Sequence, residues 1–116
     1  MLTVVADVTD AGSLADTASL AHAASLAAAA ARIRDELGPI DFAVLSAGYR
    51  KQMSANDRDT KTFNRHVHVN LIGMGNAIAA VLAQMLARRS GVIAGISSVA
   101  GYRGLTGSEA YGATKA

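Results

Sequence analysis

DFAVLSAG, residues 41–48, is the stretch on which the predicted fold depends. Residues 42–46 form a nearly continuous apolar run, which is typical of a parallel strand covered on both faces. Ala47 and Gly48 then allow the backbone to turn tightly. We therefore predict a buried parallel strand over residues 42–46, with a tight turn directly behind it.

Two further strands are predicted, one on each side of this stretch in the chain. LTVVADVTD, residues 2–10, is β-branched and ends in polar residues, so a strand is expected over residues 2–6. VIAGISS predicts a third strand over residues 92–98. Long segments separate the three strands, and none of them is joined to the next by a hairpin. This spacing predicts a parallel sheet.

Helical patterns occupy the segments between these strands. The first helix is expected over residues 13–37, which open with a capping box and end before Gly38 and Pro39. The second is expected over residues 57–89, where apolar residues recur every three or four positions. A third begins at Ser108, a residue type that caps helix N-termini. In the first helix, one apolar face is expected from Leu26, Ile33 and Leu37.

The composition fits one domain of 116 residues and excludes several function classes. The 11 Lys and Arg residues are dispersed, which argues against a nucleic-acid surface, and with no Cys and only three His no metal site is expected. Both His66 and His68 are expected in surface or packing roles. Residues 71–87 fall short of the roughly 20 apolar residues that span a bilayer. Since no secretory signal opens the chain, we expect a cytoplasmic protein without membrane partners.

The carboxyl ends of the predicted strands gather the residues that could carry chemistry. Asp7, the turn at Ala47 and Gly48, and the pair Ser97 and Ser98 all follow strands. In parallel α/β sheets, ligands bind beyond these strand ends. We therefore expect one ligand site there.

Tyr111 and Lys115 are four residues apart, so on a helix they would share one face, with the ammonium near the phenol. A cation there favours the phenolate form. Ser98 lies 13 residues before Tyr111, and Asn70 lies 28 residues before Ser98. These intervals indicate that all four residues belong to the predicted site.

As a set, these motifs resemble the short-chain dehydrogenase/reductase family. ADVTD, DFAVLSAG, HVNLIGMGNA, GVIAGISSVAG and YGATKA follow the family's order over nearly the whole chain. The resemblance implies an α/β fold with a partial Rossmann-type, doubly wound parallel sheet, in which three strands alternate with helices. It also implies that residues 1–116 form a single partial NAD(P)-binding domain. The implied activity is hydride transfer between NAD or NADP and an alcohol or carbonyl substrate.

The resemblance assigns a role to each matching residue. Tyr111 would be the general acid or base, and Lys115 would assist it and hold the nicotinamide ribose. Ser98, rather than Ser97, would bond the substrate oxygen. Asn70 would hold a water of the proton relay, with its side chain tied to a local irregularity in the helix. The cofactor would be bordered further by Asp7, Val8, Ala47 and Gly48.

Two hypotheses stay open at this point. In the first, the chain is part of an oxidoreductase, but the isolated chain is inactive, because the 116 residues contain no glycine-rich turn of T-G-x-x-x-G-x-G type to receive the pyrophosphate. In the second, the chain is a non-catalytic α/β fragment that acts as an interaction or assembly module. For either, the resemblance implies a homo-oligomer formed through the helix at residues 57–89. The choice between NAD and NADP, and the identity of the substrate, stay open.

Overall fold

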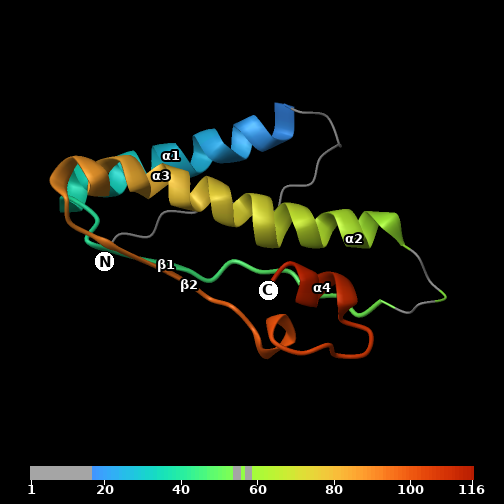
Figure 1. The fold of residues 1–116 in the computed structure, drawn as a ribbon. Coiled ribbons are helices and arrows are strands. Elements are labelled where there is room, and N and C mark those ends of the chain that lie inside the picture. Colours follow the sequence, from blue (N-terminus) through green and yellow to red (C-terminus); the bar gives the residue numbers. More distant parts are fainter. Residues whose placement is uncertain (1–16, 54–55, 57–58) are drawn as a thin grey trace.

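The computed structural model describes residues 17–53, 56 and 59–116, and Figure 1 shows its helices and strands. The expected strand over residues 2–6 and the capping box at Ser13 lie outside this part of the chain. In chain order the elements are α1 (Thr17–Leu37), β1 (Phe42–Leu45), α2 (Thr60–Val67), the π-helical turn η1 (His68–Ile72), α3 (Gly73–Arg88), β2 (Val92–Gly95), the 3-10 turn η2 (Val99–Gly101) and α4 (Glu109–Ala113).

The strands β1 and β2 are parallel neighbours, with Phe42 opposite Val92. One more backbone bond extends their ladder, from the Ile96 N–H to the Leu45 carbonyl at 3.0 Å. A single continuous helix, built from α2, η1 and α3, connects the two strands (Figure 1). Parallel strands need such a long crossover, so the predicted α/β arrangement is confirmed.

Both strands are shorter than predicted. β1 ends at Leu45 instead of residue 46, and β2 ends at Gly95 instead of residue 98. After β1 the chain turns toward the long helix, where the backbone of Tyr49 bonds to the Asn70 side chain. Within the described residues, Ser97 and Ser98 therefore have no neighbouring strand to pair with, and they lie beyond the end of β2.

The core lies between the sheet and the two long helices. Its buried residues are Ala30 from α1 and Val81 and Met85 from α3, and Ala43 and Ile93 of the strands pack against them. The predicted apolar face of α1 is wrong in one respect. Leu37 is 68% exposed, because it is the last residue of α1, where the chain turns at Gly38 (φ 97) toward β1. The small side chain of Ala30 makes the buried contact.

The second face of the sheet is apolar but exposed. Phe42, Val44 and Val92 alternate with the core-facing residues and are 60%, 54% and 53% exposed. The prediction that β1 is covered on both faces is therefore wrong for the part of the chain that the structure describes. Its helices supply a layer to one face only (Figure 1).

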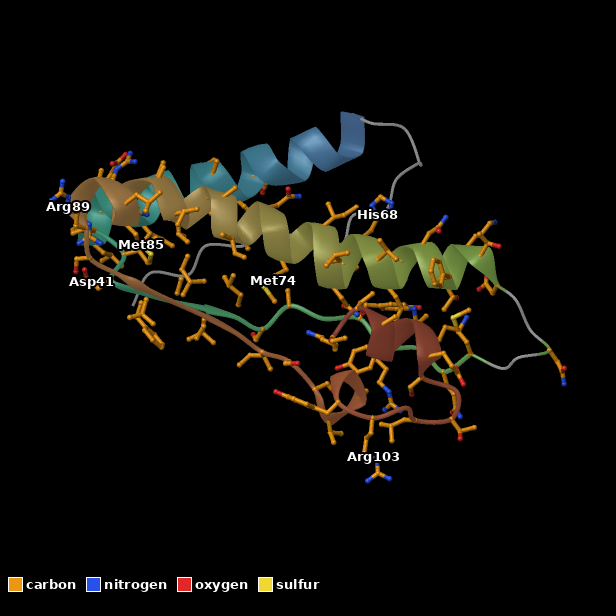
Figure 2. The ribbon with its side chains drawn as sticks, viewed as in Figure 1. Asp41, His68, Met74, Met85, Arg89 and Arg103 are labelled. Atoms are coloured by element: carbon orange, nitrogen blue, oxygen red, sulfur yellow. The ribbon has the colours of Figure 1, made fainter. Side chains whose placement is uncertain are left out.

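The C-terminal end of α3 is joined to the start of β1. Arg88 donates from Nη1 to the Asp41 carboxylate and from Nη2 to the Ile40 carbonyl, both at 2.8 Å. The helix ends at this residue, one position before the predicted end. Arg89 then takes the left-handed conformation (φ 52), and Figure 2 shows Arg89, Met85 and Asp41 gathered at this end of the molecule.

The continuous helix from Thr60 to Arg88 is long and apolar enough to cross a membrane, by length and composition alone. The predicted apolar stretch, residues 71–87, is the C-terminal part of this helix, and the N-terminal part, TKTFNRHVHVN, is largely polar. The same helix packs against α1, β1 and β2. A helix that lies in the core of an α/β domain has this length and composition as well.

Substitution of Gly91 is expected to destabilise the fold. Gly91 has φ 145, and an added Cβ would lie 2.5 Å from Met85 Cγ. Gly91→Ala should therefore lower the free energy of unfolding by roughly 1–3 kcal/mol, measured by urea denaturation. The matched control is Gly75→Ala in α3, where an added Cβ meets no atom within 4 Å. It should be neutral or stabilising by up to about 1 kcal/mol, and equal destabilisation by both variants would contradict this account.

Candidate active site

Asn70 ties the loop behind β1 to the long helix. It is 2% exposed and lies in the π-helical turn η1, as the resemblance implied. Its Oδ1 accepts from the Tyr49 N–H at 2.7 Å, and its Nδ2 donates to the Tyr49 carbonyl at 3.0 Å. The amide thus pairs with one residue's backbone as a neighbouring strand would, and it fixes the direction in which the chain leaves the sheet.

The second Nδ2 hydrogen of Asn70 reaches α4. It bonds to Thr114 Oγ1 at 2.9 Å, and that hydroxyl donates in turn to the Tyr111 carbonyl at 2.8 Å. A chain of hydrogen bonds therefore runs from Tyr49 through Asn70 and Thr114 to the backbone of Tyr111. Sequence reasoning missed Thr114. The available signal was its position next to Lys115 in YGATKA.

Lys115 is buried, and its ammonium points toward the sheet. Its Nζ donates to the Ile96 carbonyl at 2.9 Å. A Cβ built on Gly48 would lie 3.7 Å from this Nζ and 3.8 Å from Asn70 Oδ1. The structure therefore brings Gly48, Asn70 and Lys115 together, although they are far apart in the chain.

The predicted helix over residues 108–115 is too long. α4 ends at Ala113, with Thr114 as its C-cap, so Tyr111 and Lys115 do not both lie on one helix as expected. The Thr114 N–H still bonds to the Ala110 carbonyl as in an α-helix, whereas the Lys115 N–H bonds to the Gly112 carbonyl three residues back, so the backbone tightens at the end of α4. The Thr114 hydroxyl folds back onto the Tyr111 carbonyl, and the Lys115 carbonyl accepts from Ser97 Oγ at 2.7 Å.

The two serines beyond β2 have different roles. Ser97 uses its hydroxyl hydrogen on the Lys115 carbonyl. Ser98 precedes η2, and its hydroxyl oxygen accepts from the Ala100 N–H at 3.2 Å. A hydroxyl that accepts keeps its own hydrogen for donation. Ser98 is therefore the serine of this pair that could donate to a substrate oxygen.

Tyr111 is half-buried in α4, which packs beside the α2 part of the long helix (Figure 1). Its ring centroid lies 6.4 Å from that of His66 and 5.9 Å from the guanidinium carbon of Arg50. Arg50 Nη2 also donates to Ser108 Oγ at 3.2 Å. Ser108 is the N-cap residue, as predicted, but its hydroxyl makes no bond to the helix N–H groups. The Ser108 hydroxyl oxygen accepts from Arg50 instead.

His66 is fully buried and packs near the rings of Tyr49 and Tyr111. Its Nε2 accepts from the Lys51 N–H at 3.2 Å, so the ring hydrogen is on Nδ1, 2.8 Å from the Thr62 carbonyl. The Tyr49 ring packs edge-on at 4.9 Å. A packing role was among those predicted for the histidines and is confirmed for His66, whereas His68 is exposed.

A small cavity of about 170 Å³ opens at the carboxyl end of β1. Its lining comes from two places, the end of β1 with the turn behind it and the first turns of α3: Val44, Leu45, Ser46, Ala47, Gly73, Met74 and Ala77. Figure 2 shows Met74 between the helix and the strands. The predicted cofactor residues Ala47 and Gly48 are exposed here, so their backbone is accessible to a ligand.

Two other predictions are not tested here. Asp7 and Val8, the remaining cofactor residues, lie outside the described part of the chain. In the part that is described, no group of three or more His, Asp or Glu side chains is placed to hold a metal ion.

Comparison with known proteins gives one consistent result. The family model of the short chain dehydrogenases matches residues 3–116. An acetoacetyl-CoA reductase of Synechocystis sp. is 36% identical over 115 residues, which are 99% of this chain and 43% of that protein.

Solved structures agree. The crystal structure of gox2181 matches with a TM-score of 0.80 at 28% identity, over 97% of this chain and 40% of that one. The structure of ElxO with NADP bound matches with a TM-score of 0.79 at 26% identity, over 94% and 40%. The chain therefore spans about two fifths of the length of these proteins.

His66→Leu is expected to destabilise the fold, because it leaves the Lys51 N–H and the carbonyl of the buried Thr62 without their ring partners. The free energy of unfolding should fall by about 1–3 kcal/mol, measured by urea denaturation. His68→Leu, two residues away on the exposed side, should change it by no more than about 0.5 kcal/mol. If the two variants lose stability equally, the His66 hydrogen bonds do not matter as described.

Proposed function

The chain belongs to the short chain dehydrogenase family, and from this premise we propose that it takes part in hydride transfer between NAD or NADP and an alcohol or carbonyl substrate. The observation that carries the proposal is the hydrogen-bond chain from Tyr49 through Asn70 and Thr114 to Tyr111. It links two residues of the predicted proton relay, the Asn70 side chain and the backbone of Tyr111, and this link supports the proposal.

In this proposal Tyr111 transfers the proton. When a carbonyl is reduced, the Tyr111 hydroxyl donates its proton to the substrate oxygen, and in the reverse direction it accepts one. The Ser98 hydroxyl, whose hydrogen is available, donates to the same oxygen and stabilises the negative charge that develops on it. The bound nicotinamide supplies or takes up the hydride.

Lys115 and Asn70 support Tyr111 in different ways. An ammonium has three hydrogens, and Lys115 donates one of them to the Ile96 carbonyl. The other two suit the hydroxyls of a cofactor ribose. Both amide hydrogens of Asn70 are donated to protein atoms, so a relay water at this residue would donate to one of its oxygens. The backbone at Ala47 and Gly48 is exposed beside the cavity, so a cofactor that lies over the end of β1 could contact it.

A second function is favoured by the exposed side of the long helix. Its apolar residues on that side are Phe63, Leu71, Leu82 and Leu86, and with them the helix presents a stripe that no described element covers. We propose this stripe as the surface through which two copies would pair. It also supports the alternative that the chain is a non-catalytic interaction or assembly module.

The isolated 116-residue chain is expected to bind NADPH weakly and to show no measurable turnover, because its sequence has no glycine-rich turn for the pyrophosphate. NADPH fluorescence on titration with the chain measures this. A saturable titration of one NADPH per chain would contradict the expectation. Light scattering and melting of the same sample test the alternative, since a stable dimer that melts cooperatively favours a module, and a broad transition argues against one.

The catalytic role of Tyr111 can be tested in a hybrid enzyme. Residues 1–116 would replace the aligned segment of the Synechocystis acetoacetyl-CoA reductase, and NADPH consumption with a panel of carbonyl compounds would be followed. Tyr111→Phe should reduce the rate at least about 100-fold, because it removes the general acid.

The matched control in the hybrid is Tyr102→Phe. Tyr102 is also a tyrosine of the segment behind β2, but it is exposed, and its variant should keep most of the rate. Equal losses in the two variants would refute the proposed role of Tyr111.

A further inference from the structure

Arg50 places a positive charge directly beside the proposed catalytic phenol. It lies in the loop behind β1, and its guanidinium carbon is 5.9 Å from the centroid of the Tyr111 ring. One of its N–H groups is anchored on Ser108 Oγ at 3.2 Å, and Ser108 is only 3% exposed. A buried hydroxyl on another element thus sets the direction of an otherwise flexible side chain.

Most of the hydrogen-bonding capacity of Arg50 is unused. A guanidinium has five N–H donors in a planar fork, and Ser108 takes one of them. Among the described residues, the ion pairs join Arg32 with Glu36, Arg34 with Asp35, Lys51 with Asp59, and Arg88 with Asp41. Arg50 is in none of them, so its free edge can bind an anion from outside the chain.

The neighbouring charges reinforce this preference. Lys51 is adjacent in sequence, and the Arg65 guanidinium lies 4.4 Å from the centroid of the Tyr49 ring. The carboxylates nearby are already engaged, because Asp59 bonds to Thr62 and Glu109 accepts from the Gly107 N–H. Lys51 pairs with Asp59, but Arg50 and Arg65 are in no ion pair among the described residues, and their positive charges favour an anionic ligand.

We propose that Arg50 binds the carboxylate of the substrate, so that the site acts on short oxo acids and the corresponding hydroxy acids. The proposal rests on the function proposed above. A guanidinium and a carboxylate match in geometry and pair through two parallel hydrogen bonds. A carboxylate bound at Arg50 would lie beside the Tyr111 ring, whose centroid is 5.9 Å from the guanidinium carbon.

The reaction leaves the carboxylate unchanged. In reduction, the carbonyl carbon gains the hydride from NADH or NADPH, and the carbonyl oxygen gains the proton of Tyr111. The product is a hydroxy acid and the nicotinamide is oxidised. Arg50 is thus a specificity-determining residue that selects the acid over its neutral ester or amide.

Binding can be measured on the 116-residue chain itself by nuclear magnetic resonance. Levulinate and methyl levulinate, which differ in the charge of one group, would be titrated into 15N-labelled chain. Levulinate should shift the Arg50 side-chain N–H signal and the amides of Ser108 and Tyr111, with an affinity at least about tenfold above that of the ester. Equal affinities for acid and ester would overturn the proposal.

Two variants at Arg50 and one control make the assignment specific. Arg50→Gln should remove the preference for levulinate, whereas Arg50→Lys should keep part of it. Arg103→Gln removes the same charge from an exposed residue that Figure 2 shows projecting away from the rest of the molecule, and it should leave levulinate binding unchanged. An equal loss in Arg103→Gln would reduce the effect to general electrostatics and overturn the proposal.

Failure of this proposal can be told apart from failure of the proposed function. Levulinate binding to the 116-residue chain is measured without turnover, so it reports on the anion site separately from the hydride-transfer activity of the hybrid enzyme. Normal binding beside a hybrid enzyme that reduces no carbonyl compound would reject the function and keep the anion site. A hybrid that reduces neutral carbonyls while levulinate fails to bind would reject the anion site and keep the proposed function.

Discussion

The buried side-chain amide of Asn70 is the interaction on which the arrangement of the site depends. Through the Tyr49 backbone and the Thr114 hydroxyl it joins three segments, the loop behind β1, the π-helical turn and the last turn of α4. Loss of this one group would leave several polar atoms without partners at once. In a buried environment such losses are costly and reinforce one another.

The intervals in the sequence grouped Asn70, Ser98, Tyr111 and Lys115 as one candidate site, although Asn70 lies in the long helix and Lys115 follows α4 rather than a strand. The structure brings Gly48, Asn70 and Lys115 into proximity accordingly. Thr114 and His66 could not be selected in this way. His66 bonds to the backbone of Lys51 and Thr62, and backbone atoms leave no trace in a pattern of side chains. Thr114 bonds to the Asn70 side chain, which is 44 residues away in the chain, and to the Tyr111 backbone.

The ends of the elements were less predictable than their order. Local periodicity carried the predicted last helix through Lys115, whereas α4 ends at Ala113 and the Lys115 N–H bonds three residues back to Gly112. The extent of β2 was overestimated because a strand lasts only as long as it has a neighbour. For the same reason, apolar character alone predicted two covered faces for β1, although helices of the described residues lie on only one.

The two-stranded ladder also bears on how the chain behaves at high concentration. Within the described residues each strand has one neighbour, so β1 and β2 each present an outer row of N–H and C=O groups without a strand partner. Such edges accept additional strands, and with Phe42, Val44 and Val92 exposed the adjoining sheet face is prone to associate with other apolar surfaces. The edges that would accept further strands of a larger sheet would equally accept those of another copy. The solubility of the chain and the completeness of its sheet are thus governed by the same backbone groups.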